Sequence, residues 1–268
     1  MSASITATDL SIDFPIFNAS HRSLKKRVLH ATTGGRIAGD AGQRVSVRAL
    51  EGLNFDLRPG DRVGLVGHNG AGKTTLLRVL SGVYPPSSGK LDVQGRIASL
   101  TDISVGIDGE ATGFENIYLR GIVMGMTPAE INEKMDEIAD FSELGDYLNM
   151  PVRTYSSGMQ LRLAFAVSTS VQADIILMDE WLSVGDAKFA KKASERLDHM
   201  VANSSILVIA SHQEDILERL CNRRITMEHG KLVSDVSTKA ADQADASAPV
   251  EPLAEHAEPV VSASPAGV

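Results

Sequence analysis

The chain has 268 residues, 43% of them hydrophobic, and can therefore bury the core of one large domain or two small ones. Its formal net charge of -8 argues against a general nucleic-acid-binding protein, because such proteins usually carry a strongly basic surface. A single cysteine, Cys221, excludes an intramolecular disulfide and a multi-cysteine zinc site. No stretch reaches the ~18 consecutive apolar residues of a membrane-spanning helix. We expect a cytoplasmic protein, unless a partner holds it at a membrane, and no nucleic acid among its partners.

The N-terminal part is predicted to be β-structure. Residues 5–14 are strand-like, and strand character resumes at Val45. Between them, the basic stretch 20–30 is interpreted as a solvated face, with a contact to anionic lipid headgroups as the alternative. Residues 31–44 are rich in glycine and threonine and are expected to form a loop.

Short apolar runs alternate with helical segments between residues 62 and 210, which is typical of a parallel sheet covered by helices. The runs 62–66, 175–178 and 206–209 are predicted strands, and the last two are apolar on both faces, as strands between helix layers must be. We therefore expect an α/β fold, with a mixed sheet of parallel core flanked by helices and an antiparallel part at the N-terminus.

A helical insert is expected over about residues 112–170, where Ile131, Met135 and Ile138 recur at helical spacing. After residue 236 the composition changes to alanine, proline, serine and acidic residues. The segment 237–268 is therefore predicted to be a disordered tail, inert or partner-binding, and residues 1–236 to form the domain.

A glycine-rich loop joins the strand ending at Val66 to a predicted helix. It satisfies the pattern G-x-x-x-x-G-K-[ST] of phosphate-binding loops, whose backbone N–H groups and helix N-terminus surround phosphate oxygens. Lys73 would reach the β- and γ-phosphates, and the Thr74 hydroxyl would ligate Mg²⁺. No Asn-Lys-x-Asp motif for guanine is present, which favours ATP. The candidate nucleotide-binding residues are Gly67, His68, Asn69, Gly70, Ala71, Gly72, Lys73, Thr74 and Thr75.

Two carboxylates follow the predicted strand 175–178, at the sheet edge where ligands of open parallel sheets bind. Asp179 is suited to hold Mg²⁺, and Glu180 to act as general base on the attacking water. His212, just after the strand that ends at Ala210, could contact the γ-phosphate, although a lone histidine is more often structural.

Residues 155–160 read Tyr-Ser-Ser-Gly-Met-Gln and resemble the signature motif of the ABC transporter ATPases, whose commonest form is Leu-Ser-Gly-Gly-Gln. The order of phosphate loop, signature, acid pair, the run 183–186 (Ser-Val-Gly-Asp) and then Ser211 with His212 is similar to that of this family over about residues 5–235. The resemblance implies a P-loop NTPase of ABC type that hydrolyses ATP with Mg²⁺.

The same resemblance implies a head-to-tail dimer with a second copy of the chain, in which each ATP lies between the phosphate loop of one copy and the signature of the other. Ser156 and Gly158 would then contact the partner's nucleotide, because a hydroxyl, an N–H and a helix N-terminus form an anion site. Asp186 would lie beside the partner's nucleotide, and His212 would be a catalytic switch histidine with Glu180.

The sequence departs from the family pattern in places. Ser157 replaces the first signature glycine and Met159 the usual glutamine. The glutamine that the family carries before the helical insert is missing, and Asp102 is the candidate to replace it as a magnesium or water contact. For adenine stacking the candidate aromatic is Phe17, with Phe14 as the alternative; either could equally be a core residue.

The sequences of residues 112–118, 155–159 and 179–186 resemble those of one branch in particular, the ATPases that export O-antigen, capsule or teichoic acid. That branch often has an acidic residue in the position of Asp102. The resemblance implies an integral membrane permease as partner, a lipid-linked polysaccharide as cargo, and a peripheral location at the cytoplasmic face of the inner membrane. The alternatives are a subunit of another ABC importer or exporter, and a soluble mechanical ABC ATPase.

Overall fold

The computed structural model describes residues 2–16, 37–39, 45–101, 103, 106–180 and 187–237. The chain divides into two units, Met1–Thr238 and Lys239–Val268, and the described residues all belong to the first. The basic stretch 20–30 and all but the first residue of the expected tail lie outside the described part. The domain boundaries expected from composition therefore stay a prediction.

The N-terminal part forms the expected antiparallel sheet. Its strands are β1 (Ser4–Ile16), β2 (Ile37–Gly39), β3 (Val45–Leu57) and β5 (Ser88–Gln94), in the order β2-β3-β1-β5. The short strand β2 corrects the expectation of a loop over residues 31–44, since three of these residues pair with the start of β3. Pairing satisfies backbone groups at the sheet edge, which a composition rich in glycine does not reveal.

A second sheet has six strands in the order β10-β9-β4-β8-β7-β6. Five of them run parallel, and β10 pairs antiparallel with β9, so the sheet is mixed with a parallel core as predicted. The strands are β4 (Arg62–Val66), β6 (Ile97–Ser99), β7 (Ile175–Asp179), β8 (Ile206–Ala210), β9 (Arg223–Glu228) and β10 (Lys231–Ser237).

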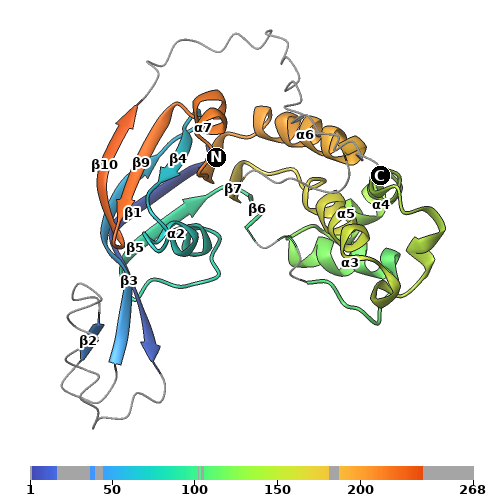
Figure 1. Cartoon of the computed structure of the whole chain (residues 1–268), viewed down its shortest axis with the longest axis horizontal. Helices are drawn as coiled ribbons and strands as arrows, with labels where there is room; N and C mark the ends of the chain where they lie inside the picture. The colour runs from blue at the N-terminus through green and yellow to red at the C-terminus, as the bar shows by residue number, and fades with distance from the viewer. Residues whose placement is uncertain are drawn as a thin grey trace, which may run out of the picture. The chain divides into compact units, whose positions relative to one another are not determined.

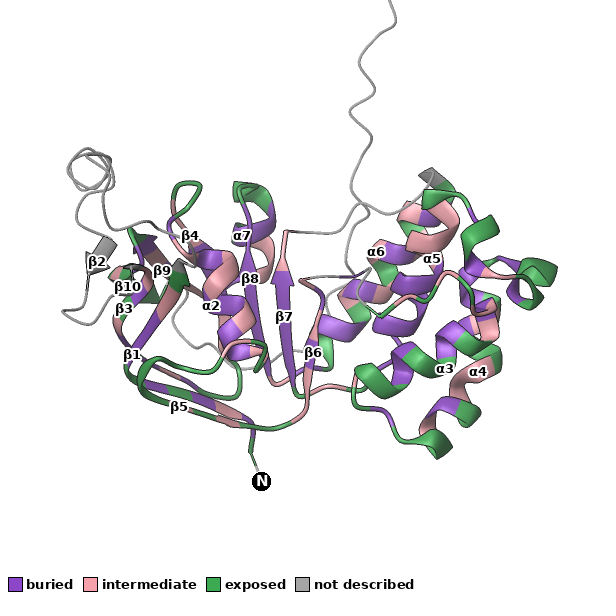
Figure 2. Cartoon of the chain, turned by 90° about the horizontal axis from the view of Figure 1, so that it is seen from below, coloured by how far each residue is buried: buried purple, intermediate pink, exposed green. Residues whose placement is uncertain are grey.

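The central strands of this sheet are buried on both faces (Figure 2). Ile175 and Leu177 pack into a cluster with helix α2 (Lys73–Leu80) and the antiparallel sheet. Ile176 and Met178 point the other way, into a cluster with the helices of the insert and the helices that follow β7. Because side chains alternate along a strand, only an unbroken apolar run can fill both layers. This burial fixes the position of the carboxyl end of β7.

The expected helical insert forms between β6 and β7. Its elements are α3 (Gly113–Val123), α4 (Pro128–Ser142), the 3₁₀ turns η1 (Gly145–Asn149) and η2 (Val152–Thr154), and α5 (Ser157–Ser168). Threonine side chains cap α3 and α4 in reciprocal capping boxes. Ile131 and Ile138 are buried, as their spacing predicts, and Met135 packs beside them. Among the described helices, none has the length and apolarity needed to cross a membrane.

The insert packs firmly against helix α6 (Ala187–Ala202) (Figure 1). The rings of Phe141, Phe165 and Phe189 contact one another, with centroid distances of 5.6, 6.1 and 6.2 Å. The Lys192 ammonium lies 4.6 Å from the Phe141 ring centroid and 3.1 Å from a Glu143 oxygen. These contacts join α4, α5 and α6. The last described helix is α7 (Glu214–Leu220).

Candidate functional site

The loop between β4 and α2 can be built only with glycine at two positions. Gly67 has a φ of +152°, and a Cβ there would lie 2.2 Å from the backbone oxygen of Met227. Gly72 has a φ of +108°, and its Cβ would lie 2.9 Å from Leu50. Positive φ and close backbone approach both favour glycine. The predicted phosphate loop is thus packed between β9 and β3 in a fixed shape.

The N-terminus of α2 is open to an anion. Gly72 is its N-cap and supplies no side-chain hydrogen bond, and the first turn contains no acidic residue. The first N–H groups of a helix and its dipole attract negative charge when no carboxylate occupies the position. Lys73, which is 8% exposed, donates hydrogen bonds to the carbonyls of Gly67 and His68 at 2.6 and 3.3 Å. A lysine ammonium and a helix N-terminus therefore lie together at one loop.

The exposed side of this loop carries a histidine pair. His68, Asn69 and Gly70 are exposed, and the His68 ring lies 4.8 Å from the ring of His229, at the β9–β10 turn. The Nδ1 atom of His68 lies 2.8 Å from the Asn69 oxygen. His229 was not a sequence candidate, because only the pairing of β9 beside β4 brings it to the loop. Thr75 lies half-buried in the first turn of α2.

The two predicted metal ligands are in contact. The Thr74 hydroxyl donates a 2.6 Å hydrogen bond to Oδ2 of Asp179, although the residues are 105 positions apart. Within the described residues no group of three or more His, Cys, Asp or Glu side chains is placed to hold a metal. The two oxygen donors of Thr74 and Asp179 fit Mg²⁺, which usually takes one or two protein oxygens and completes its shell with water and phosphate.

The predicted catalytic residues are also neighbours. Glu180 follows β7 with an unusual φ of 75°, and its N–H donates to the Ala210 oxygen at 2.7 Å. Its Oε1 lies 4.0 Å from Nε2 of His212. The pairing of Asp179 with Ala210 across β7 and β8 explains why residues so distant in sequence meet. A left-handed conformation in a residue other than glycine is strained, and such strain often marks functional sites.

The signature residues lie in the helical insert, away from the phosphate loop (Figure 2). Ser156 is the N-cap of α5, and its Oγ accepts a 3.3 Å hydrogen bond from the Met159 N–H. A Cβ on Gly158 would meet only the Ser156 hydroxyl, at 3.9 Å, so the start of α5 is open. Figures 1 and 2 show α5 within the helical insert and α2 between the two sheets. The structure therefore does not join this motif to the phosphate loop of the same chain.

Three candidates fall outside the described residues: Phe17, Asp102 and Asp186. The alternative aromatic, Phe14, packs edge-to-face on Tyr84 with ring centroids 5.1 Å apart. The segment leading to position 102 continues β6 beside β7, since the Leu100 N–H donates to the Leu177 oxygen at 2.8 Å. The adenine contact and the replacement of the glutamine stay predictions.

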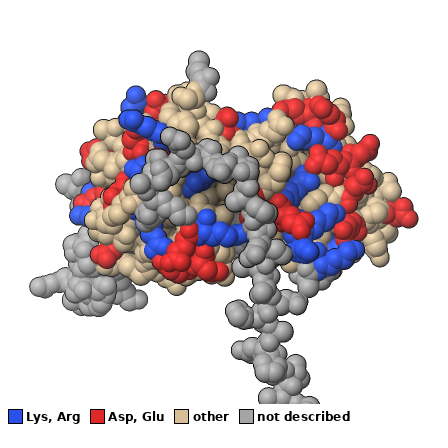
Figure 3. Space-filling model, turned by 90° about the horizontal axis from the view of Figure 1, so that it is seen from above, with Lys and Arg blue, Asp and Glu red and all other residues tan. Residues whose placement is uncertain are grey.

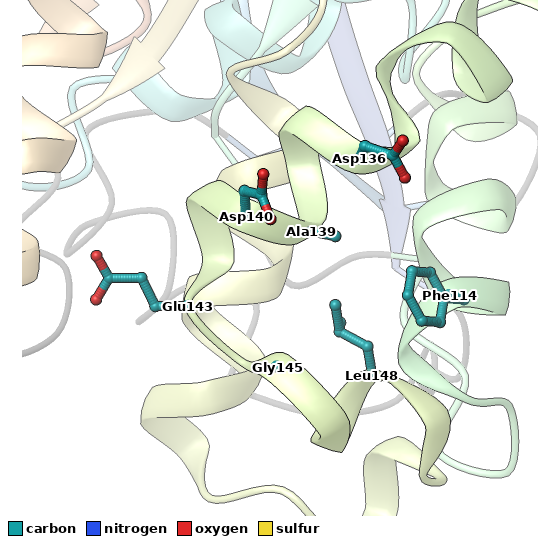
Figure 4. A pocket seen from close by; sticks show the side chains of 7 residues that line it. All are labelled: Phe114, Asp136, Ala139, Asp140, Glu143, Gly145 and Leu148. Carbon is teal, nitrogen blue, oxygen red and sulfur yellow. The ribbon is translucent and has the colours of Figure 1, made fainter.

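A hollow of about 640 Å³ lies in the helical insert, away from the phosphate loop (Figure 4). Phe114 of α3 and Leu148 of η1 lie close together in it, and Asp136 and Asp140 project from α4. Glu143 points away from this group and is paired with Lys192. The hollow combines an apolar floor with an acidic margin.

Charged side chains of both signs are intermixed on the molecular face shown in Figure 3. A nucleic-acid-binding surface would instead gather lysine and arginine into a continuous stripe.

Comparison with known proteins shows that this chain is similar to ATP-binding subunits of transport systems. A family model described as ABC transporter matches residues 50–183. The O-antigen export system ATP-binding protein RfbE of Yersinia enterocolitica is 44% identical over 232 residues, which are 87% of this chain and 97% of that protein. The teichoic acids export ATP-binding protein TagH of Listeria monocytogenes is 41% identical over 184 residues, 69% of this chain and 55% of that protein. The chain thus spans only about half the length of this second relative.

Solved structures share the fold. The ATP-binding cassette MJ0796, in a dimeric post-hydrolysis state bound to ADP and Pi, superposes with a TM-score of 0.62 at 17% identity, over 88% of this chain and 99% of that chain. A structure of the ATP binding subunit of an ABC transporter has a TM-score of 0.62 at 20% identity, over 87% of this chain and 89% of that one. The α/β fold with its antiparallel N-terminal part and helical insert is the one expected from the sequence.

Proposed function

This chain belongs to the ABC transporter family of ATP-binding proteins, and from that premise we propose that it powers the export of a lipid-linked cell-surface polysaccharide. It is an ATPase of that family. The relatives that support the cargo are O-antigen and teichoic acid export proteins at 44% and 41% identity. The observation that carries the ATP chemistry is the meeting of the open loop at Lys73, the Thr74–Asp179 pair and Glu180 at one sheet edge.

Within this site we assign a separate role to each side chain. Lys73 and the N–H groups at the start of α2 bind the β- and γ-phosphates. Thr74 and Asp179 hold Mg²⁺, which neutralises phosphate charge when bound. Glu180 accepts the proton of the attacking water, and His212 contacts the γ-phosphate beside it. His68, Asn69, Gly70 and Ala71 shape the loop around the phosphates. Outside the described residues, Phe17 is assigned to the adenine and Asp102 to the magnesium or water, while Asp186 is assigned to the nucleotide of the partner chain.

We propose that the active form is a dimer of this chain. Ser156 and Gly158 lie at an open helix N-terminus, which is an anion site with no phosphate loop beside it in its own chain. A second copy would supply the missing nucleotide, so that ATP lies between the two chains and its hydrolysis releases them. The solved cassette MJ0796 is itself dimeric in its post-hydrolysis state.

An integral membrane permease is the proposed second partner, which would hold this chain at the cytoplasmic face of the inner membrane. Helix α3, which follows the Asp102 segment in the sequence, exposes four large apolar side chains. The first half of this helix also lines a hollow of about 480 Å³. Exposed apolar patches of this kind mark protein contacts. The exposed residues of α3 are Tyr118, Leu119, Ile122 and Val123.

Co-purification tests this assignment. The chain is tagged in its native host, membranes are extracted with mild detergent, and the proteins retained with it are identified by mass spectrometry. We expect a small multi-span permease to be recovered at about equal molar amount. A Leu119→Asp, Val123→Asp double variant should lose the permease, while Val83→Asp, an exposed valine outside the insert, should retain it. Recovery only from the soluble fraction, or with ribosomes or DNA, would overturn the transport function.

A further inference from the structure

The Glu180 carboxylate has a neighbour that the proposed mechanism has not used. The Ser211 hydroxyl donates a 2.9 Å hydrogen bond to Oε2 of Glu180. The same hydroxyl oxygen accepts a 3.1 Å hydrogen bond from the Gln213 N–H. Because Gln213 supplies a proton to the oxygen, the hydroxyl proton of Ser211 is directed at the carboxylate.

Ser211 is buried, whereas the carboxylate that it contacts is partly exposed. Its exposed fraction is 2%, whereas 45% of the Glu180 side chain is exposed. A glutamate side chain at a half-exposed position would otherwise sample several rotamers. The hydrogen bond from the buried serine therefore favours one orientation of a partly exposed carboxylate.

Three successive residues at the end of β8 contact Glu180. Ala210 accepts its backbone N–H at 2.7 Å, Ser211 binds Oε2, and Nε2 of His212 lies 4.0 Å from Oε1. The two carboxylate oxygens are thus distinguished. Oε2 already accepts a hydrogen bond from the protein, and Oε1 faces the histidine that the mechanism places beside the γ-phosphate.

We propose that Ser211 is a positioning residue that leaves Oε1 of Glu180 as the oxygen that accepts the proton. The water oxygen bonds to the γ-phosphorus, the bond from the γ-phosphorus to the bridging oxygen breaks to release ADP, and the water proton passes to Oε1. The inference rests on the proposed role of Glu180 as base. It does not depend on the transported cargo.

The test measures ATP hydrolysis by full-length variants with Mg²⁺ and ATP. Ser211→Ala is expected to lower kcat ~10- to 100-fold, since small displacements of a catalytic group have effects of this size. The KM for ATP should change less than ~2-fold, because Ser211 acts on the base and not on the phosphate loop. Ser211→Thr keeps the hydroxyl and should restore most of kcat. Ser204→Ala is the control, a buried serine before the opposite end of β8 whose hydroxyl contacts Arg62.

A double-mutant cycle separates positioning from general destabilisation. In a Glu180→Gln background, Ser211→Ala should lower the residual rate by less than ~2-fold, because coupled residues do not act additively. Equal losses in both backgrounds, or a wild-type kcat in Ser211→Ala, would overturn the inference. The cycle tests the positioning role without the threonine variant, so it remains informative if Ser211→Thr folds poorly. A wild-type rate in Glu180→Gln would refute the role of Glu180 itself, whereas failure of glycan to stimulate hydrolysis would refute only the cargo.

Discussion

Replacement of Glu180 by glutamine is expected to lower kcat for ATP hydrolysis by about 100- to 10,000-fold, the usual contribution of a general base. The amide keeps the size of the side chain but cannot accept a proton from water. ATP binding should persist, because Lys73, Thr74 and Asp179 are untouched. The variant should therefore accumulate as an ATP-bound dimer, measured by size-exclusion chromatography with light scattering in saturating ATP and Mg²⁺.

The matched control for this variant is Glu133→Gln, the same change at an exposed glutamate of α4. It should hydrolyse ATP at the wild-type rate and should not accumulate as a dimer. If Glu180→Gln stays monomeric in saturating ATP, the proposal that the nucleotide is held between two copies of the chain is refuted.

Removal of the Lys73 side chain is expected to weaken ATP binding by about 30- to 150-fold, which corresponds to the ~2–3 kcal/mol of a hydrogen bond to a charged group. The ammonium of Lys73 now contacts the carbonyls of Gly67 and His68, within the loop that would surround the phosphates. Lys73→Ala leaves the loop glycines in place. Isothermal titration calorimetry with ATP and Mg²⁺ measures the change.

Lys90→Ala is the control for charge, since Lys90 is exposed on β5 and away from the phosphate loop. Circular dichroism melting of both variants shows whether the fold is retained. A folded Lys73→Ala protein that binds ATP with unchanged affinity would contradict the assigned role of the lysine.

The central fold was predictable because its requirements are local. Short unbroken apolar runs such as 175–178 and 206–209 are typical of strands between two layers, and the structure buries both faces of each. The phosphate loop was predictable for a similar reason. Gly67 and Gly72 have backbone angles and neighbours that admit no other residue, so the motif itself encodes the shape of the loop.

Contacts that depend on strand order were not predictable. Glu180 and Ser211 are 31 residues apart, and they meet because β7 and β8 are adjacent and parallel. His229 approaches His68 only because β9 pairs with β4. The short strand β2 was missed because its pairing with β3, rather than its composition, makes it a strand. Sequence periodicity indicates that strands exist but does not give their lateral order.

The signature motif shows a different limit. Ser156 and Gly158 are predicted from their residue types to form an anion site, and the structure places them at the open start of α5, in the helical insert and not at the phosphate loop. The role proposed for them requires a second chain, which the structure of one chain does not contain. The acidic residue Asp102 and the aromatic Phe17 stay predictions for the reason that both lie outside the described residues.

The central claim is that this ATPase exports a lipid-linked polysaccharide, and the most direct measurement is ATP hydrolysis by the co-purified membrane complex. The complex is reconstituted in liposomes with lipid-linked polysaccharide extracted from the native host, and in parallel with the same extract after the glycan has been cleaved from its lipid. We predict a hydrolysis rate that rises several-fold with the intact glycan and not with the cleaved one. Equal rates with the two extracts would contradict the claim.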